Sequence, residues 1–173
     1  IKQIEKLVNE FSDFARMPKP TFQKNNLSQI LNENIKLLHE IDNSIDIIFL
    51  NNSKDIILHC DKEQISRVFF NLIKNSIESI HQKGEKDSNN VKKINIELIE
   101  NSDHINFVIQ DTGVGFNDLQ SNIKDILNPY FTTKKEGTGL GLSIVNKIVN
   151  DHNGNIKFTS VEDGAKIEIL FKK

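Results

Sequence analysis

The sequence has little that could cross-link the chain or anchor it in a membrane. It contains a single cysteine, Cys60, which excludes an internal disulfide and fits a reducing compartment. No apolar run approaches the roughly 20 residues that a helix needs to span a bilayer, and no signal-peptide pattern is present. The formal net charge is only −2, so no excess of basic residues favours nucleic-acid binding.

The residues that are present favour one globular domain with a short appendage. The chain has 173 residues, of which 37% are hydrophobic and 27% charged, a profile typical of soluble globular proteins. Ile1 falls within a helical pattern and is not preceded by Met. We therefore expect a fragment of a longer protein.

The first predicted helix ends at a pair of prolines. Its apolar residues recur at helical spacing: Ile4, Leu7, Val8, Phe11, Phe14 and Ala15. Pro18 and Pro20 come next, and proline disfavours helix at the preceding residue. The apolar stripe could face the rest of the domain or a partner helix outside the sequence. Because the prolines separate this helix from the remainder of the chain, we favour the partner helix.

Three further helices are predicted. Ser28 is expected to cap the second, with an inner face of Ile30, Leu31, Ile35, Leu38 and Ile41. Asp61 is expected to cap a long third helix, and Gln64 completes a capping-box pattern. The buried face of this helix is predicted to hold Ile65, Val68, Phe69, Leu72, Ile73, Ile77 and Ile80. The fourth helix is expected over 139–151.

Alternating apolar residues predict strands at 45–50, 56–60, 93–99, 104–110, 155–161 and 165–171. Residues 51–54, 101–103 and 162–164 would connect successive pairs of them, and 83–90 is expected to be a loop. From Phe116 to Glu136 the pattern is poor, and so long a loop in a compact domain is usually functional, often a lid. These elements predict an α+β fold, with a layer of mostly antiparallel strands and three helices on one face.

Asp111-Thr-Gly-Val-Gly115 directly follows a predicted strand. A carboxylate at a strand end can accept a hydrogen bond from an exocyclic amine such as that of adenine. Gly113 and Gly115 allow a close approach that a side chain would block. Taken alone, the motif is more often an ordinary Asp-Gly turn.

A second glycine cluster, Gly137-Thr-Gly-Leu-Gly141, enters the fourth helix. Backbone amides at a helix start favour anions, so the cluster could hold phosphate. No Gly-Lys-Ser/Thr follows, as in a P-loop, and no strand directly precedes it, as in a dinucleotide fingerprint. Taken alone, it is more often a flexible linker.

Asn71 and Asn75 are four residues apart and share one face of the third helix. Amide oxygens are costly on a mostly apolar helix unless they find partners, and Mg²⁺ accepts oxygen ligands together with phosphates and water. Lys74 and Lys134 could pair with phosphate. In an Asn-rich chain, two exposed asparagines remain the simpler interpretation of this motif alone.

Together, these motifs resemble the catalytic, ATP-binding domain of bacterial sensor histidine kinases. That domain belongs to a superfamily with gyrase, the mismatch-repair MutL proteins and the ninety-kilodalton heat-shock chaperone. The resemblance covers residues 27–171 and consists of four boxes in order: Asn71 to Asn75, Asp111 to Gly115, Pro129-Tyr-Phe-Thr-Thr-Lys134 and Gly137 to Gly141. The Phe-Thr-Thr-Lys version of the third box is similar to nitrogen-regulation sensors of the NtrB and NtrY type.

The resemblance implies a two-layer, Bergerat-type ATP-binding fold over 21–173, with a lid at about 116–138. Residues 1–20 would end the dimerisation domain as its second helix. Asn75 would be the catalytic residue that coordinates Mg²⁺, with Asn71 facing the phosphates, and Asp111 would bind the adenine amine. The implied ATP-binding set is Asn71, Lys74, Asn75, Asp111, Gly113, Gly115, Phe131, Lys134, Gly137, Thr138, Gly139, Leu140 and Gly141.

Three departures from the family pattern stand out. No histidine has the context of a phosphoacceptor, since His39-Glu40 is not followed by Asn-Pro and lies after the first helix. Glu78 stands three places after the metal asparagine, where many relatives have a basic or aromatic residue. Ala165 stands where many relatives have a threonine near the adenine.

The resemblance implies transfer of the ATP γ-phosphate to a histidine outside this sequence, and from there to an aspartate of a response regulator receiver domain. It also implies docking to the protein's own phosphoacceptor helix, a homodimer at full length, and a cytoplasmic domain in a protein that the inner membrane can anchor. Hydrolytic relatives of the gyrase or chaperone branch typically have a water-activating glutamate where Asn71 stands, which argues against a hydrolytic ATPase. An anti-sigma-type serine kinase fits the first helix less well. A nucleotide-sensing module without kinase activity has Glu78 as its only support.

Overall fold

The computed structural model describes residues 12, 17–84, 91–116, 126–132, 134 and 137–173. Most of the first predicted helix, and residues 117–125, 133 and 135–136 of the predicted lid, lie outside this part of the chain. Within these described residues, ten elements follow one another: β1 (Gln23–Asn26), α2 (Leu27–Ile41), β2 (Asp46–Asn51), β3 (Ile57–Cys60), α3 (Lys62–Gly84), β4 (Lys93–Glu100), β5 (His104–Asp111), α4 (Gly141–Asp151), β6 (Asn155–Val161) and β7 (Gly164–Lys172).

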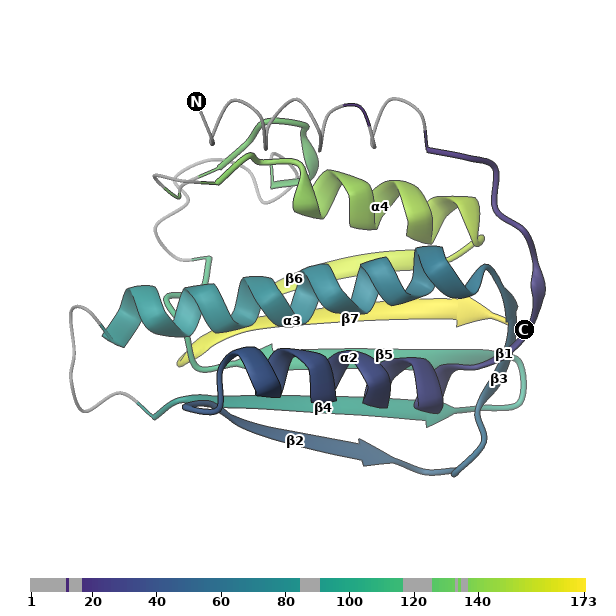
Figure 1. Cartoon of the computed structure of the whole chain (residues 1–173), viewed down its shortest axis with the longest axis horizontal. Coiled ribbons are helices and arrows are strands. Elements are labelled where there is room, and N and C mark those ends of the chain that lie inside the picture. Colours follow the sequence, from purple (N-terminus) through teal and green to yellow (C-terminus); the bar gives the residue numbers. More distant parts are fainter. Residues whose placement is uncertain (1–11, 13–16, 85–90, 117–125, 133, 135–136) are drawn as a thin grey trace.

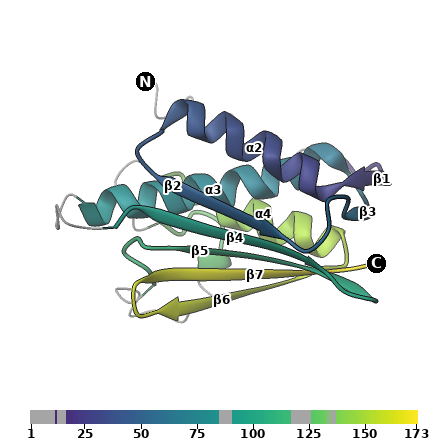
Figure 2. The same ribbon diagram turned by 90° about the horizontal axis from the view of Figure 1, so that it is seen from below.

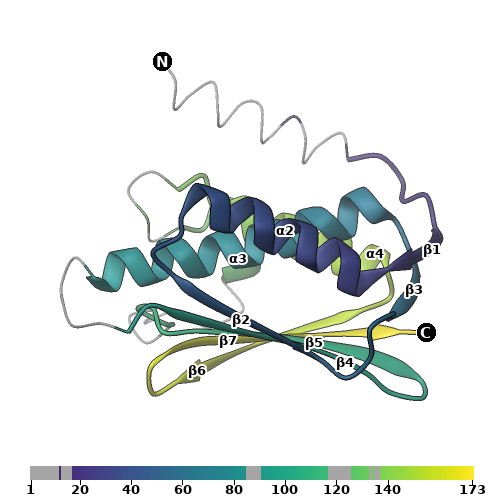
Figure 3. The ribbon, with the colours of Figure 1, turned by 60° about the horizontal axis from the view of Figure 1, so that its bottom comes forward.

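The main sheet has five strands in the order β2-β4-β5-β7-β6. β2 pairs with β4 in parallel, whereas β4–β5, β5–β7 and β7–β6 are antiparallel. Figure 1 shows α2, α3 and α4 lying across one face of this sheet, with α3 between the other two. Figures 2 and 3 show the same two layers from other sides. The predicted α+β fold with three helices on one face is confirmed.

The prediction that all strands form one layer is wrong for one of them. β3 does not join the main sheet but pairs antiparallel with β1, which the sequence patterns did not predict. The four residues of β1 are polar, so no alternation of apolar residues marks them. The Asn25 side-chain amide supports the pairing by donating to the carbonyl of Cys60 at 2.8 Å.

The core lies between the three helices and the main sheet. Every apolar residue predicted for the buried face of α3 is buried, and the rings of Phe69 and Phe107 pack at a centroid distance of 4.9 Å. In α2 the prediction holds for Ile30, Leu31 and Leu38 but is wrong for Ile41, which is 71% exposed at the end of the helix.

The helix caps differ in part from the sequence prediction. Asn26, rather than Ser28, caps α2, because its side chain accepts a hydrogen bond from the Gln29 N–H while Ser28 is buried inside the helix. Asp61 caps α3 as predicted, accepting from the Gln64 N–H at 3.0 Å. α3 also continues through residues 83 and 84, which were predicted to be loop.

In the capping box, His152 takes the place of the Gln64 side chain as the acceptor of the Asp61 N–H. The Gln64 side chain reaches the carbonyl of Pro18 at 2.9 Å instead of the Asp61 N–H. That N–H donates to Nε2 of His152 at 3.0 Å, and His152 Nδ1 donates to the carbonyl of Ile148 at 2.8 Å. His152 is the C-cap of α4, so it joins the end of α4 to the start of α3.

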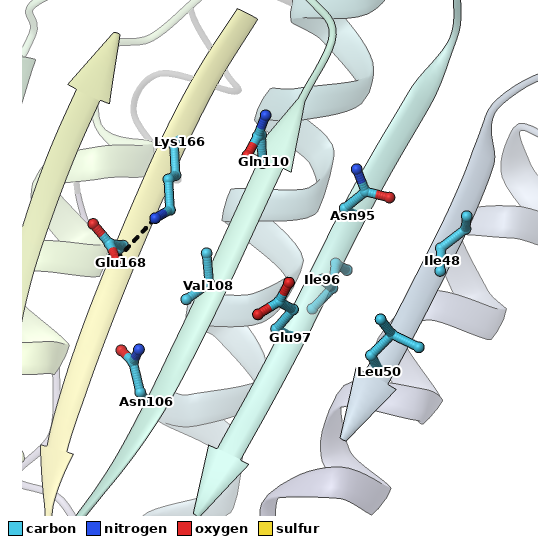
Figure 4. A pocket seen from close by; sticks show the side chains of 10 residues that line it. All are labelled: Ile48, Leu50, Asn95, Ile96, Glu97, Asn106, Val108, Gln110, Lys166 and Glu168. Carbon is cyan, nitrogen blue, oxygen red and sulfur yellow. Dashed lines mark ion pairs between the residues drawn. The ribbon is translucent and has the colours of Figure 1, made fainter. Parts of the chain in front are cut away.

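The face of the main sheet turned away from the helices carries a hollow of about 410 Å³. Figure 4 shows its mixed lining, which includes an ion pair between Lys166 and Glu168 at 3.1 Å. Its residues are Ile48, Leu50, Asn95, Ile96, Glu97, Asn106, Val108, Gln110, Lys166 and Glu168. None of them belongs to the sequence motifs, which lie on the helix side or at strand ends.

Candidate functional site

Helix α3 is the element on which the motifs meet. Asn71 and Asn75 lie one turn apart and are both half-buried. A Cβ added at Gly141 would lie 3.6 Å from Asn71 Oδ1 and 3.9 Å from Asn75 Nδ2. The start of α4 therefore faces the two asparagines. Asn71 is held by its own Nδ2, which donates to the carbonyl of Arg67 at 2.9 Å.

Asp111, at the end of β5, is buried against the same helix. The carboxylate accepts from Ser76 Oγ at 2.9 Å and from the Gly113 N–H at 2.9 Å, one donor on each oxygen. Burial raises the pKa of Asp111, and the hydrogen bonds from Gly113, Ser76 and the Ala165 backbone oppose that rise. The structure thus presents a fixed carboxylate at the strand end, as the sequence motif predicted.

The first glycine cluster is packed too tightly for side chains. A Cβ at Gly113 would lie 2.1 Å from Ser79 Oγ, and one at Gly115, where φ is +69°, would lie 2.5 Å from the Gly164 carbonyl oxygen. The Ser79 hydroxyl also accepts from the Val114 N–H at 3.1 Å. The backbone after Asp111 is therefore held close to α3 and to the β6–β7 turn.

The second glycine cluster packs against the Pro-Tyr-Phe segment. Gly139 has φ +69°, and a Cβ there would lie 2.4 Å from the carbonyl carbon of Tyr130. The Tyr130 N–H donates to the Gly139 carbonyl at 3.0 Å, and Tyr130 itself has a φ of 69°. Residues 130 and 139 are thus joined immediately before α4, close to the C-terminal end of the segment predicted to be a lid.

Lys134 extends from this segment to α3. Its Nζ lies 2.5 Å from Glu78 Oε2 and 3.3 Å from Asn75 Oδ1. Glu78 also lies 3.9 Å from Lys74 Nζ. Both lysines that were predicted to pair with phosphate are thus paired with one carboxylate.

The remaining predicted residues lie around this centre. Leu140 is buried and its carbonyl accepts from the Ser143 hydroxyl at the start of α4. Gly137 donates to the Lys134 carbonyl at 3.2 Å. Phe131 and Thr138 are half-buried.

Two residues of the site were missed by the sequence analysis, Ser76 and Ser79. They follow Asn75 on α3 and contact the Asp111-to-Gly115 backbone or side chain. A serine within a helix carries no pattern of its own. Only their position on the helical wheel, on the face of α3 next to Asn75, could have indicated them.

The donor set around Asn75 fits a magnesium ion that is completed by other ligands. Among the described residues there is no group of three or more His, Cys, Asp or Glu side chains that could hold a metal by itself. Asn75 offers one amide oxygen, and Mg²⁺ commonly binds through one or two protein oxygens together with phosphates and water. The described residues therefore do not supply a complete ligand set for a metal ion by themselves.

The sequence that forms this site matches a known protein family. The family described as histidine kinase-, DNA gyrase B- and HSP90-like ATPases matches residues 60–173, which include all four boxes. The chain belongs to this ATPase family. Residues 23–59, which form β1, α2, β2 and most of β3, lie before the matched region.

Within the ATPase family, the chain is homologous to the catalytic domains of sensor histidine kinases. It is 33% identical over 169 residues to a putative NtrY-like sensor histidine kinase of Rickettsia prowazekii, covering 97% of this chain and 27% of that protein. The chain thus spans about a quarter of the length of that curated relative. The predicted likeness to the NtrY type is confirmed.

Solved structures agree with this placement. The catalytic domain of the histidine kinase ThkA superposes with a TM-score of 0.74 at 28% identity, covering 88% of this chain and 96% of that chain. ThkA in complex with the response regulator TrrA superposes with a TM-score of 0.78 at 23% identity, covering 99% of this chain and 48% of that chain. The solved structures show the same fold, and the family match and the NtrY-like relative show that the chain is an ATP-binding catalytic domain of the sensor histidine kinase type.

Proposed function

We propose that this domain binds MgATP between α3, the end of β5 and the start of α4, and donates the γ-phosphate to a histidine outside this sequence. The observation that carries the proposal is the convergence on α3. Asn71 and Asn75 face Gly141, while the next serine on the same helix holds Asp111. One helix thus carries the two asparagines that face the start of α4 and the serine that holds the carboxylate proposed to bind the base.

The central residues of the predicted set would then have distinct physical roles. Asn75 would hold Mg²⁺ through its amide oxygen, and Lys134, already within 3.3 Å of that oxygen, would pair with phosphate. The amides from Gly137 to Gly141 at the start of α4 would favour the phosphate charge. Asp111 would accept a hydrogen bond from the adenine amine. The metal would neutralise phosphate charge, and positioning would supply most of the catalysis.

The phosphoacceptor is proposed to lie on another helix. The five histidines of this chain belong to elements of the catalytic fold, and three of them already have hydrogen-bond partners: His81 with Asp42, His104 with Asp103 and His152 with Ile148. We further propose that residues 1–20 end a dimerisation domain and that 21–173 form the catalytic domain, including a lid at about 116–138.

A response regulator is the proposed recipient of the phosphate. ThkA, whose structure this chain resembles, has been crystallised with its response regulator TrrA. Homodimerisation and membrane anchoring at full length are proposed from the homology to sensor kinases. No helix among the described residues has the length and apolar composition needed to cross a membrane.

Hydrolysis is disfavoured as the main activity. A water-activating carboxylate is expected at the position of Asn71, which offers only an amide. Glu78, the nearby acidic side chain on the same helix, is paired with Lys134. An isolated nucleotide-sensing module remains the second candidate, with Glu78 at the site as its support.

Two measurements test the proposal. Calorimetry with a non-hydrolysable ATP analogue should show binding that strengthens when Mg²⁺ is added. γ-Labelled ATP should then label a separately supplied phosphoacceptor domain from an NtrY-type kinase, at an acid-labile, base-stable site. Binding without transfer would favour the sensing module. Steady phosphate release, lost in Asn75→Ala, would favour the ATPase.

A further inference from the structure

Ser76 occupies a buried position on α3, and the residues next to it on that face are apolar. Its neighbours on that face, Ile73, Ile77 and Ile80, are all buried, and Ser76 itself is 2% exposed. A hydroxyl placed among them is costly unless it has a partner. Its partner is the carboxylate of Asp111, to which Oγ donates at 2.9 Å.

The Ser76 hydroxyl determines how Asp111 can be used. Asp111 is 4% exposed, and its other oxygen accepts from the Gly113 N–H at 2.9 Å. An ionised carboxylate has about four acceptor positions, so it can still accept a hydrogen bond from one further donor. The fixed donors, from Ser76, Gly113 and the Ala165 backbone, set its orientation and leave it as an acceptor, provided that it stays ionised.

Loss of the hydroxyl would change this state in a predictable direction. Burial raises the pKa of Asp111, and the Ser76 hydrogen bond is one of the interactions that lower it. A protonated carboxyl group carries an O–H donor, which would meet the N–H donors of an amine unfavourably. Ser76 therefore supports the ionised, accepting form.

We propose that Ser76 is a positioning residue that sets specificity for a 6-aminopurine, by orienting the Asp111 carboxylate toward the exocyclic amine. The inference rests on the proposed binding of ATP in this site. A 6-oxopurine would bring a carbonyl oxygen against the carboxylate, so two acceptors would meet. The binding affinity of a purine without a substituent at position 6 would not depend on Ser76.

The test compares Ser76→Ala with the unsubstituted protein on two nucleotides. One is a non-hydrolysable ATP analogue, and the other is the same compound with hydrogen in place of the 6-amino group. We expect Ser76→Ala to weaken binding of the first by about tenfold, as for a lost hydrogen bond to a charged group, and of the second by less than about twofold. Alanine favours helix more than serine does, so α3 should form.

Two further variants keep the outcome interpretable. Ser76→Thr retains a hydroxyl and should restore the preference for the 6-amino compound. Ser79→Ala is a matched change one turn along α3, and it removes the acceptor of the Val114 N–H. It should weaken the binding of both nucleotides by a similar factor. Thermal unfolding of each variant reports on the fold separately from binding.

The possible failures are distinguishable. Equal weakening of both nucleotides by Ser76→Ala would show that Ser76 acts only on the fold and would overturn its role in specificity. A Ser76→Thr variant that lacks the preference would also overturn it. If the unsubstituted protein binds neither nucleotide, the proposed function fails, and this inference fails with it.

Discussion

The ammonium group of Lys134 bridges Glu78 and Asn75, at 2.5 Å from the Glu78 carboxylate and 3.3 Å from the Asn75 amide oxygen. A lysine from the segment before α4 thus occupies the position next to the proposed metal ligand. Because one ammonium cannot pair fully with Glu78 and with a phosphate, nucleotide binding and the Glu78 pair should compete for Lys134.

Glu78→Gln should therefore strengthen MgATP binding. The change removes the carboxylate that holds Lys134 and also removes a negative charge near the phosphates. We expect a three- to tenfold lower dissociation constant for ATP, which corresponds to about 1 kcal/mol, and little change for adenosine. Glu63→Gln, an exposed change on the first turn of α3, is the control. Weaker ATP binding by Glu78→Gln would instead indicate that Glu78 helps to bind the metal.

Asn75→Ala should abolish the effect of Mg²⁺ on nucleotide binding. Without the amide oxygen, the site loses the protein ligand proposed for the metal, so ATP should bind with similar affinity with and without Mg²⁺. Calorimetry under both conditions measures the difference. Asn32→Ala, an exposed change on α2, should leave the Mg²⁺ effect intact. A retained Mg²⁺ effect in Asn75→Ala would assign the metal to other ligands.

Gly139→Ala should destabilise the base of the predicted lid. The residue has φ +69°, and its new Cβ would lie 2.4 Å from the Tyr130 carbonyl carbon. We expect a loss of about 1–3 kcal/mol in the free energy of unfolding, measured by denaturant titration, together with weaker ATP binding. At Gly84 the nearest contact to a new Cβ is 3.9 Å, so Gly84→Ala should change stability by less than about 1 kcal/mol. Equal losses in the free energy of unfolding for Gly139→Ala and Gly84→Ala would contradict the steric strain expected at position 139.

Asp42 should contribute stability that depends on pH. Its hydrogen bond with His81, and further bonds from Ser44, lower its pKa from 3.8 to about 2. Because the folded pKa lies below the unfolded value, this stability is present above about pH 4 and is lost as the pH falls toward 2.

Asp42→Asn should therefore lower the free energy of unfolding by about 1 kcal/mol near neutral pH, a figure reduced for partial solvent exposure. The difference from the unsubstituted protein should shrink to a small fraction of this value as the pH falls to about 2. Asp46→Asn, an exposed change on β2, provides the comparison. A difference that stays constant from pH 7 to pH 2 would exclude this origin.

The sequence alone was sufficient for most of the fold because its strongest signals are long and periodic. The seven apolar residues of α3 recur with helical spacing, and the capping Asp61 marks its start. β1 could not be predicted, since its polar residues are held by pairing with β3 rather than by burial. The placement of β3 outside the main sheet depends on the same pairing.

The site was predictable as a set of motifs but not as a set of contacts. The boxes identify which residues belong together because all four occur in order, although each motif alone is common. The Glu78–Lys134 pair joins residues 56 positions apart, and the Ser76–Asp111 bond joins residues 35 apart. Only the folded chain brings such partners into contact.

The bond between His152 and the Asp61 N–H has a mechanical consequence for the domain. It fastens the end of α4 to the start of α3 at 3.0 Å, whereas Asn71 and Gly141 face each other one helix length away, about 15 Å along α4. For two helices joined at one end, a rotation about the joint causes displacements that grow with distance from it. A change of angle between α3 and α4 about this bond would therefore move Gly141 relative to Asn71 more than it moves the residues next to His152.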